Sequence, residues 1–223
     1  MKVVCFDALG TLIDISHVTS AVENRFPGLG EKISPLWRTK QIDYSRLRAM
    51  SGEYVPFDQI TRDALEASLM HCHIPYTELD LTELMADYLH GVTFPEVDSV
   101  LAALDVPWSI LTNGNRPFIR VILDHAKVNC PDPHLLTSDH VETFKISPAL
   151  YELAWHWAQE LGARSKVEVI FVSGNQWDAI GGTWFGFTTF WVNRNGHSPE
   201  VLGVRPDYES ETLEQLLSVI RDL

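Results

Sequence analysis

The sequence contains few cysteines and no long hydrophobic run. Its 223 residues include only Cys5, Cys72 and Cys130, an odd number at spacings that match no zinc-binding pattern. We therefore expect reduced, ordinary thiols.

No uncharged apolar run approaches the roughly 18 residues that a membrane span needs. Met1-Lys2 leads directly into an apolar segment with no targeting peptide, so we expect a cytoplasmic protein that does not bind membranes.

Basic residues are also scarce. Seventeen Lys and Arg face 30 Asp and Glu, which gives a formal net charge of -13. Nucleic acids and anionic membranes bind proteins through positive patches, so this charge argues against both as partners. A small anionic ligand would therefore need individual Lys or Arg side chains at its binding site. The chain has 45% hydrophobic residues, enough for one sizeable core and a subdomain, and it shows no repeat, low-complexity tract or linker.

The first apolar segment, residues 3–6, predicts a buried strand. It is short, rich in β-branched and aromatic residues, and stopped by Gly10-Thr11. Asp7 would lie where this strand ends. In open parallel sheets, ligands bind in the crevice beyond the carboxyl ends of the strands, so Asp7 is a candidate site residue. The alternative for a single such aspartate is a solvated turn residue or a helix N-cap.

A long helical segment follows the first strand. Apolar residues recur at helical spacing over residues 16–54, and Pro27-Gly28 divides this stretch into two helices. Further helices are predicted over residues 57–71 and from residue 79 to about residue 90. The segment 14–92 is therefore predicted to be all helical.

Strands and helices alternate in the remainder of the chain. Strands are predicted at 108–111, 135–138, 167–172 and 188–192, and helices at 96–104, 117–126, 147–161, from 175 onward, and at 211–223. This order predicts an α/β fold, a Rossmann-like doubly wound parallel sheet with a helical cap subdomain inserted after the first strand. We expect a core domain of residues 1–13 and 93–223 and a cap of residues 14–92.

Polar side chains gather at three predicted strand ends. They are Asp7 with Thr11, Thr112 with Asn113, and Ser173 with Asn175 and Asp178. Because the strands are expected to be parallel, these ends would face the same side of the sheet. Each group alone is more typical of a turn or a helix cap, but their repetition at one edge indicates a site.

Five segments of the sequence resemble the L-2-haloacid dehalogenases of the haloacid dehalogenase superfamily in order and spacing. They are FDALGTL at 6–12, LWRTKQ at 36–41, LTNG at 111–114, Lys145, and FVSGNQWD at 171–178. The first segment is shared with many phosphatases, whereas Leu-Trp-Arg and Ser-x-Asn-x-Trp-Asp are narrower. The resemblance implies hydrolytic removal of halide from short L-2-haloalkanoates to give D-2-hydroxyalkanoates, by a protein that is commonly a homodimer and needs no cofactor or metal.

The resemblance also implies roles for individual residues. A carboxylate, here Asp7, can displace a halide from carbon to give an ester that water then cleaves. Arg38 and Asn113 would receive the halide, Lys145 would keep the nucleophile ionised, and Asp178 would activate the water. The implied catalytic residues are Asp7, Thr11, Arg38, Asn113, Lys145, Tyr151, Ser173, Asn175 and Asp178. The implied substrate-binding residues are Ala8, Leu9, Arg38, Thr112, Asn113 and Trp177, with Phe57 as a further apolar wall.

Other interpretations remain open at this point. Arg38 could be a solvated cap charge, and Lys145 a surface lysine. A magnesium-dependent phosphatase of the same superfamily would need an acid two residues after the nucleophile and another near the last motif, where this chain has Leu9 and Gly174. A catalytically inactive member that binds an anion or a partner protein is the third possibility.

Overall fold

The first strand, β1 (Val3–Phe6), lies inside a six-stranded sheet in this computed structural model, which describes residues 1–223. The strand order is β5-β4-β1-β6-β7-β8, and every neighbouring pair is parallel. The other strands are β4 (Trp108–Thr112), β5 (Leu135–Thr137), β6 (Val169–Ser173), β7 (Thr188–Val192) and β8 (Tyr208–Ser210). All six carboxyl ends therefore point to one edge of the sheet, as the sequence predicts.

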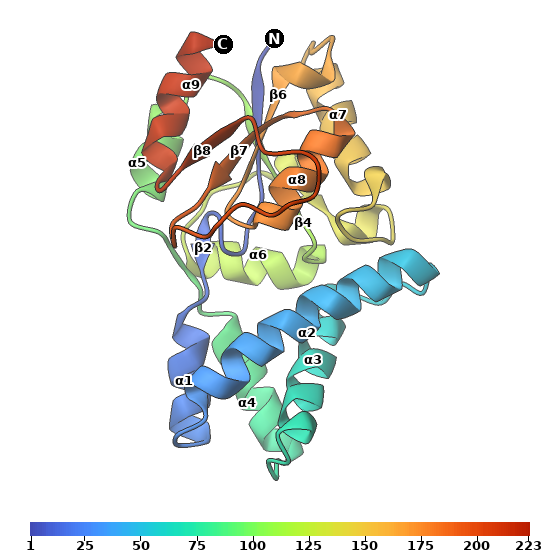
Figure 1. Ribbon diagram of the computed structural model, residues 1–223, viewed down its shortest axis with the longest axis vertical. Helices are drawn as coiled ribbons and strands as arrows, with labels where there is room; N and C mark the ends of the chain where they lie inside the picture. The colour runs from blue at the N-terminus through green and yellow to red at the C-terminus, as the bar shows by residue number, and fades with distance from the viewer.

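Side chains point alternately to the two sides of the sheet, and both faces of the sheet are buried. Val4 and Phe6 of β1 belong to one apolar cluster, and Val3 and Cys5 belong to the other, because successive side chains of a strand point to opposite sides. The first face packs against α5 (Val97–Ala103), α6 (Arg116–His125) and α9 (Leu216–Asp222). The second packs against α7 (Pro148–Glu160), with α8 (Gln176–Phe185) beside it (Figure 1).

A separate group of helices lies beyond the carboxyl edge of the sheet (Figure 1). This cap consists of α1 (His17–Arg25), α2 (Gly30–Ser51), α3 (Phe57–His71) and α4 (Glu78–Tyr88). The chain enters and leaves it through a two-stranded antiparallel ribbon of β2 (Ile13–Asp14) and β3 (Val92–Thr93). None of the helices has the combination of length and apolar character that crossing a membrane requires.

The predicted α/β class and helical insertion are confirmed. The prediction that the segment 14–92 is all helical is wrong at its two ends, because Asp14 and Val92 pair with each other in the β2–β3 ribbon. Other differences concern the bounds of elements and one further strand. The strand predicted from residue 167 begins at Val169, because Lys166–Glu168 form a 3-10 turn capped by Ser165. The tail helix begins at Leu216 and not at residue 211, because a 3-10 turn precedes it. Strand β8 was not predicted, since its three residues lie at the edge of the sheet and are not an apolar run.

Candidate active site

The Asp7 carboxylate lies directly after β1, and its two oxygens have different surroundings. Oδ2 accepts hydrogen bonds from Thr11 Oγ1 at 2.8 Å, Asn175 Nδ2 at 2.8 Å and Ser173 Oγ at 3.5 Å. Oδ1 accepts one protein hydrogen bond, from Lys145 Nζ at 3.0 Å. The single Ser173 proton is shared with Asp178 Oδ2, which lies 3.2 Å from Ser173 Oγ, so Thr11 and Asn175 are the donors that fix Oδ2, while Oδ1 keeps free lone-pair capacity.

A tight turn after Asp7 brings Thr11 back toward the carboxylate. Gly10 has a φ of +83°, in the left-handed region that favours glycine. Its carbonyl oxygen would lie 2.1 Å from a Cβ placed on Gly174, so this approach leaves no room for a side chain at position 174. The Gly174 N–H donates to Thr11 Oγ1 at 2.8 Å. The two loops therefore interlock, and the acidic residue that a phosphatase would carry at position 174 does not fit here.

Lys145 joins two carboxylates inside the protein. Its side chain is 1% exposed, and Nζ lies 3.0 Å from Asp7 Oδ1 and 2.7 Å from Asp178 Oδ2. Burial by itself would lower the pKa of Lys145, but the negative charges of Asp178 and Asp7 raise it above its ordinary value. The ammonium group therefore stays charged between the two acids.

Asp178 is the most deeply buried of the ionisable residues at the site. Its Oδ1 accepts from Tyr151 Oη at 2.7 Å, and its Oδ2 accepts from Ser173 Oγ at 3.2 Å. Burial raises the pKa of Asp178 to about 6, against the lowering effect of Lys145. Burial, reinforced by the Asp178 charge, raises the pKa of Tyr151 well above its ordinary value, so its phenol remains a hydrogen-bond donor.

Arg38 extends from α2 of the cap toward the core. Its Nη2 donates to Asn175 Oδ1 at 3.3 Å, and its Nη1 donates to Gln41 Oε1 at 2.6 Å. Gln41 is fully buried and donates in turn to Thr61 Oγ1 at 2.7 Å, which fixes it against α3. The guanidinium is therefore held over the edge of the sheet and is not a solvated surface charge.

Two residues after β4 complete the polar wall. Asn113 Oδ1 accepts from the backbone N–H of Lys145 at 2.7 Å, which orients the amide. Its Nδ2 donates to no protein group, so the amide N–H groups are free to bind a ligand. Thr112 Oγ1 accepts from the Gly114 N–H at 3.1 Å and keeps its own proton to donate.

A pocket between the cap and the core brings these groups together. It encloses about 340 Å³, counting its opening to solvent. Its polar lining residues are Asp7, Arg38, Ser45, Thr112, Asn113 and Asn175, and its apolar ones are Leu9, Ile42, Phe57 and Trp177. The arrangement places a carboxylate, a guanidinium and an amide around one small space with an apolar wall.

Not every predicted residue lines this pocket. Lys145, Thr11, Tyr151, Ser173 and Asp178 lie behind Asp7 in the buried network. The Ala8 side chain packs in the core, and its carbonyl accepts the Leu12 and Ile13 amides.

Sequence reasoning missed two lining residues, Ile42 and Ser45. They follow Arg38 by four and seven residues, so helical periodicity could have placed them on the same face of α2.

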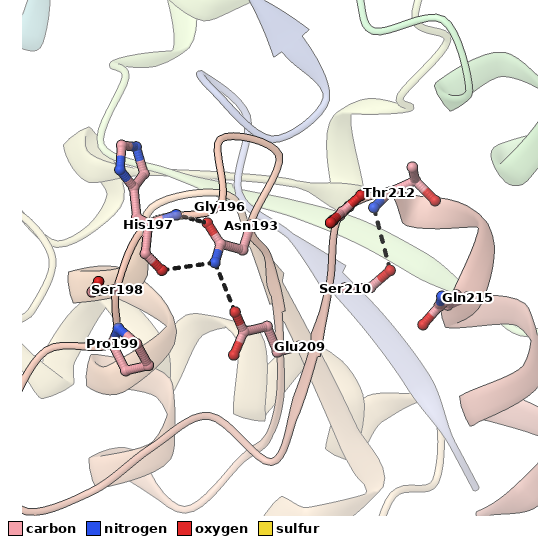
Figure 2. Close-up of a pocket in the computed structure, with 10 residues that line it drawn as sticks. Asn193, Gly196, His197, Ser198, Pro199, Glu209, Ser210, Thr212 and Gln215 are labelled. Atoms are coloured by element: carbon pink, nitrogen blue, oxygen red, sulfur yellow. Dashed lines mark hydrogen bonds between the residues drawn. The ribbon is translucent and has the colours of Figure 1, made fainter.

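A second and larger hollow, of about 1080 Å³ counting its opening, lies at the ends of β7 and β8 (Figure 2). Its lining contains no hydrophobic residue and shares no residue with the pocket around Asp7. The smaller pocket exposes the Asp7 carboxylate, and the buried Lys145 and Asp178 lie directly behind it, so this pocket is the candidate active site.

Comparison with known proteins agrees with this geometry. A family model described as haloacid dehalogenase-like hydrolase matches residues 1–186. The (S)-2-haloacid dehalogenase of Pseudomonas sp. (strain YL) is 36% identical over 222 residues, which cover 98% of this chain and 94% of that protein. The crystal structure of the L-2-haloacid dehalogenase RSc1362 is 38% identical, with a TM-score of 0.92 and coverage of 99% of both chains.

A further solved structure contains a covalent complex. The L-2-haloacid dehalogenase of Xanthobacter autotrophicus with chloropropionic acid covalently bound is 29% identical, with a TM-score of 0.90 and coverage of 100% of this chain and 99% of that one. The fold and site define a capped α/β hydrolase of the haloacid dehalogenase superfamily. Within that superfamily, the chain belongs to the L-2-haloacid dehalogenases.

Proposed function

We propose that the protein is an (S)-2-haloacid dehalogenase that converts short L-2-haloalkanoates to D-2-hydroxyalkanoates with inversion, through an ester on Asp7. The observation that carries the proposal is the single small pocket that holds Asp7, Arg38 and Asn113 between apolar walls. The similarity to proteins named for this activity supports the substrate class.

In the first step, Asp7 Oδ1 attacks the halogen-bearing carbon of the substrate. A carbon–oxygen bond forms, the carbon–halogen bond breaks, and the halide leaves with the bonding electron pair on the far side. Oδ1 is the attacking atom because Oδ2 already accepts hydrogen bonds from Thr11 and Asn175. Arg38 and the free amide N–H of Asn113 stabilise the charge that develops on the halide, an effect that is largest in a site shielded from water.

The rest of the substrate is held by the other pocket residues. The Thr112 hydroxyl and the backbone N–H groups of Ala8 and Leu9, which donate to no protein acceptor, bind the substrate carboxylate. Leu9, Phe57 and Trp177 contact the alkyl group. Fixing the carboxylate and the alkyl group presents only one face of the carbon to Oδ1, and this selects the L-enantiomer.

In the second step, water attacks the carbonyl carbon of the ester. Asp178 takes the proton, and a pKa near 6 leaves it mostly ionised and able to do so at neutral pH. In the ester, Oδ2 is the carbonyl oxygen and becomes negative during the attack. Its donors Thr11, Ser173 and Asn175 then form an oxyanion hole. As the intermediate collapses, Asp178 returns its proton to the former Oδ1, which leaves in the hydroxy acid. Asp7 is left with one oxygen from water and releases the second water proton, which restores its carboxylate.

The geometry favours this chemistry over magnesium-dependent phosphate hydrolysis. Lys145 Nζ lies between Asp7 and Asp178, where a divalent cation shared by these two acids would have to be placed. Leu9 provides no acid to protonate a leaving group, and Gly174 has no room for a metal-binding side chain.

The test is halide release from each enantiomer of 2-chloropropionate in the presence of EDTA, with a parallel phosphatase assay in magnesium. The proposal predicts release from the L-enantiomer alone, with D-lactate as the product. Phosphate release without dehalogenation would support the phosphatase, and inactivity in both assays would support an anion- or partner-binding protein.

We also propose a homodimer. The supporting observation is an apolar groove beside the pocket, lined by the exposed side chains of Met50, Trp184 and Leu202. Sedimentation velocity should show a dimer for the wild-type chain and a shift toward monomer for Met50→Glu. The matched control is Met70→Glu, an exposed methionine on α3, which should leave the dimer intact.

We propose that the β2–β3 ribbon divides a core of residues 1–13 and 93–223 from a cap of residues 14–92. The segment that enters the cap and the segment that leaves it pair with each other in this ribbon.

We propose a cytoplasmic location, in keeping with three free cysteines and with the burial that raises the pKa of the Cys5 thiol to about 12.

A further inference from the structure

Arg194, which follows β7, contacts the loop that carries the nucleophile. Its Nη2 donates to the Thr11 carbonyl at 2.9 Å and its Nη1 donates to the Gly10 carbonyl at 3.3 Å. The Arg194 side chain is only 15% exposed. It does not line the pocket and has no part in the chemical steps described above.

The same guanidinium contacts the chain where it returns from the cap. Nε and Nη2 donate to Glu96 Oε1 at 3.1 and 2.7 Å, and Cζ lies 3.7 Å from the centre of the Phe94 ring. Phe94 follows β3 directly, and its N–H donates to the Leu12 carbonyl at 3.2 Å. One side chain therefore binds both the nucleophile loop and the hinge of the cap.

The position of Arg194 is fixed by the residue before it. Asn193 is 6% exposed, and its Nδ2 donates to the His197 carbonyl at 2.9 Å and to Glu209 Oε1 at 2.7 Å. Its Oδ1 accepts from the His197 N–H at 2.8 Å, which closes the turn (Figure 2). This closed turn holds the backbone from which Arg194 extends.

We propose that Arg194 is a positioning residue that couples the cap hinge to the orientation of Asp7. It acts through Thr11: the guanidinium holds the Thr11 carbonyl, and the Thr11 hydroxyl donates to Asp7 Oδ2 and so turns Oδ1 toward the substrate. Movement of the cap at Phe94 and Glu96 is transmitted to the nucleophile by the same group. The expected change in kcat rests on the proposed dehalogenase function, whereas the expected change in hydrogen exchange does not.

The test compares the wild-type protein with Arg194→Met, which keeps much of the packing against Phe94 and removes every donor. Misplacement of a reacting group by about 1 Å can cost on the order of 100-fold in rate, so we expect kcat for L-2-chloropropionate to fall by about 30- to 100-fold. KM should change by less than about threefold, because the pocket lining is intact. Arg194→Lys, which keeps the charge and one donor, should recover part of the lost kcat.

Hydrogen exchange gives a readout that does not depend on activity. In Arg194→Met, peptides covering residues 8–13 and 92–97 should exchange faster together, while peptides of α3 should not change. Arg205→Met, an exposed arginine farther along the same loop, is the control and should behave as wild type.

Unchanged kcat in Arg194→Met, with only a lower melting temperature, would overturn the proposal and leave Arg194 a structural residue. Faster exchange in only one of the two segments would also overturn the coupling. If the wild-type protein releases no halide, the proposed function fails, and the exchange data alone decide whether Arg194 links the two segments.

Discussion

The core and the cap contribute to the site in different ways. The core supplies Asp7, Lys145 and Asp178, which are at most 7% exposed and are joined by hydrogen bonds of 2.7 to 3.0 Å. The cap supplies Arg38, whose bond to the core, at 3.3 Å to Asn175, is longer. If Asp7 is the nucleophile and Arg38 binds the halide, as proposed, the difference predicts that the nucleophile is organised before substrate binds, whereas the position of Arg38 depends on the cap.

The strongest test of the core contribution is Asp7→Asn. This change removes the nucleophilic oxygen and keeps the shape of the side chain, so halide release should fall by at least about 10⁴-fold. Intact-mass spectrometry should show no covalent adduct with substrate. Circular dichroism should match wild type, because Oδ1 of the asparagine still accepts from the Oδ2 donors or from Lys145.

Asp178→Asn should separate the two chemical steps. Oδ1 of Asp7 can still attack, but no base is available for water, so turnover should fall by about 10²- to 10⁴-fold. The ester should then accumulate, and the mass of the protein should rise by that of the substrate less hydrogen halide. Loss of turnover with no trapped adduct would contradict the assignment of Asp178 to the second step.

The pH dependence of ester hydrolysis should follow Asp178. Burial raises the pKa of this acid to about 6, and the Asp7 charge adds to the rise; the ester removes that charge, so in the ester the base form is present above about pH 6 and is lost as pH falls further. Single-turnover ester decay should therefore be level above about pH 7 and fall roughly tenfold per unit below about pH 5. A rate that rises on acidification would contradict a carboxylate base.

Arg38→Met tests the cap contribution. Loss of one charge-stabilising donor group typically costs about 10²- to 10³-fold in kcat, and Arg38→Lys should lose less because it keeps the charge. The control is Arg48→Met on the same helix, which donates only to the Glu53 carbonyl and should change kcat by less than about twofold. Equal losses in both variants would indicate general damage to α2.

The smallest expected effect is that of metal removal. Since the Lys145 ammonium already lies between the two carboxylates and pairs with both, EDTA should change kcat by less than about twofold, and added magnesium should not increase it. A rate that EDTA abolishes and magnesium restores would show that the reaction needs a divalent cation beside these carboxylates and would contradict the role given to Lys145.

The sequence predicted most of this architecture, because strong periodicity determines long elements. The helix predicted over residues 57–71 agrees with α3 at both ends. Strand β8 and the β2–β3 ribbon were missed, because two or three residues at an edge are determined by their pairing partner and leave no pattern of their own. Asp7, Thr11, Ser173 and Asp178 could be proposed because they follow the ends of predicted strands, whereas Lys145 and Tyr151 could be proposed only from the resemblance to the family.

Other features of the site depend on distances that no pattern in the chain specifies. Nothing in the sequence predicts that a Cβ added to Gly174 would collide with the Gly10 carbonyl oxygen. Likewise, the contacts of Arg194 with Gly10 and Thr11 join residues more than 180 positions apart. The different surroundings of the two Asp7 oxygens also follow from tertiary contacts alone.

The most direct test of the ester mechanism is a single turnover in ¹⁸O-water with enzyme in excess over L-2-chloropropionate. The mechanism predicts that ¹⁸O enters the peptide containing Asp7 and that the lactate is unlabelled, since its new oxygen comes from the carboxylate. Labelled lactate with unlabelled Asp7 would show direct attack by water and would contradict the account.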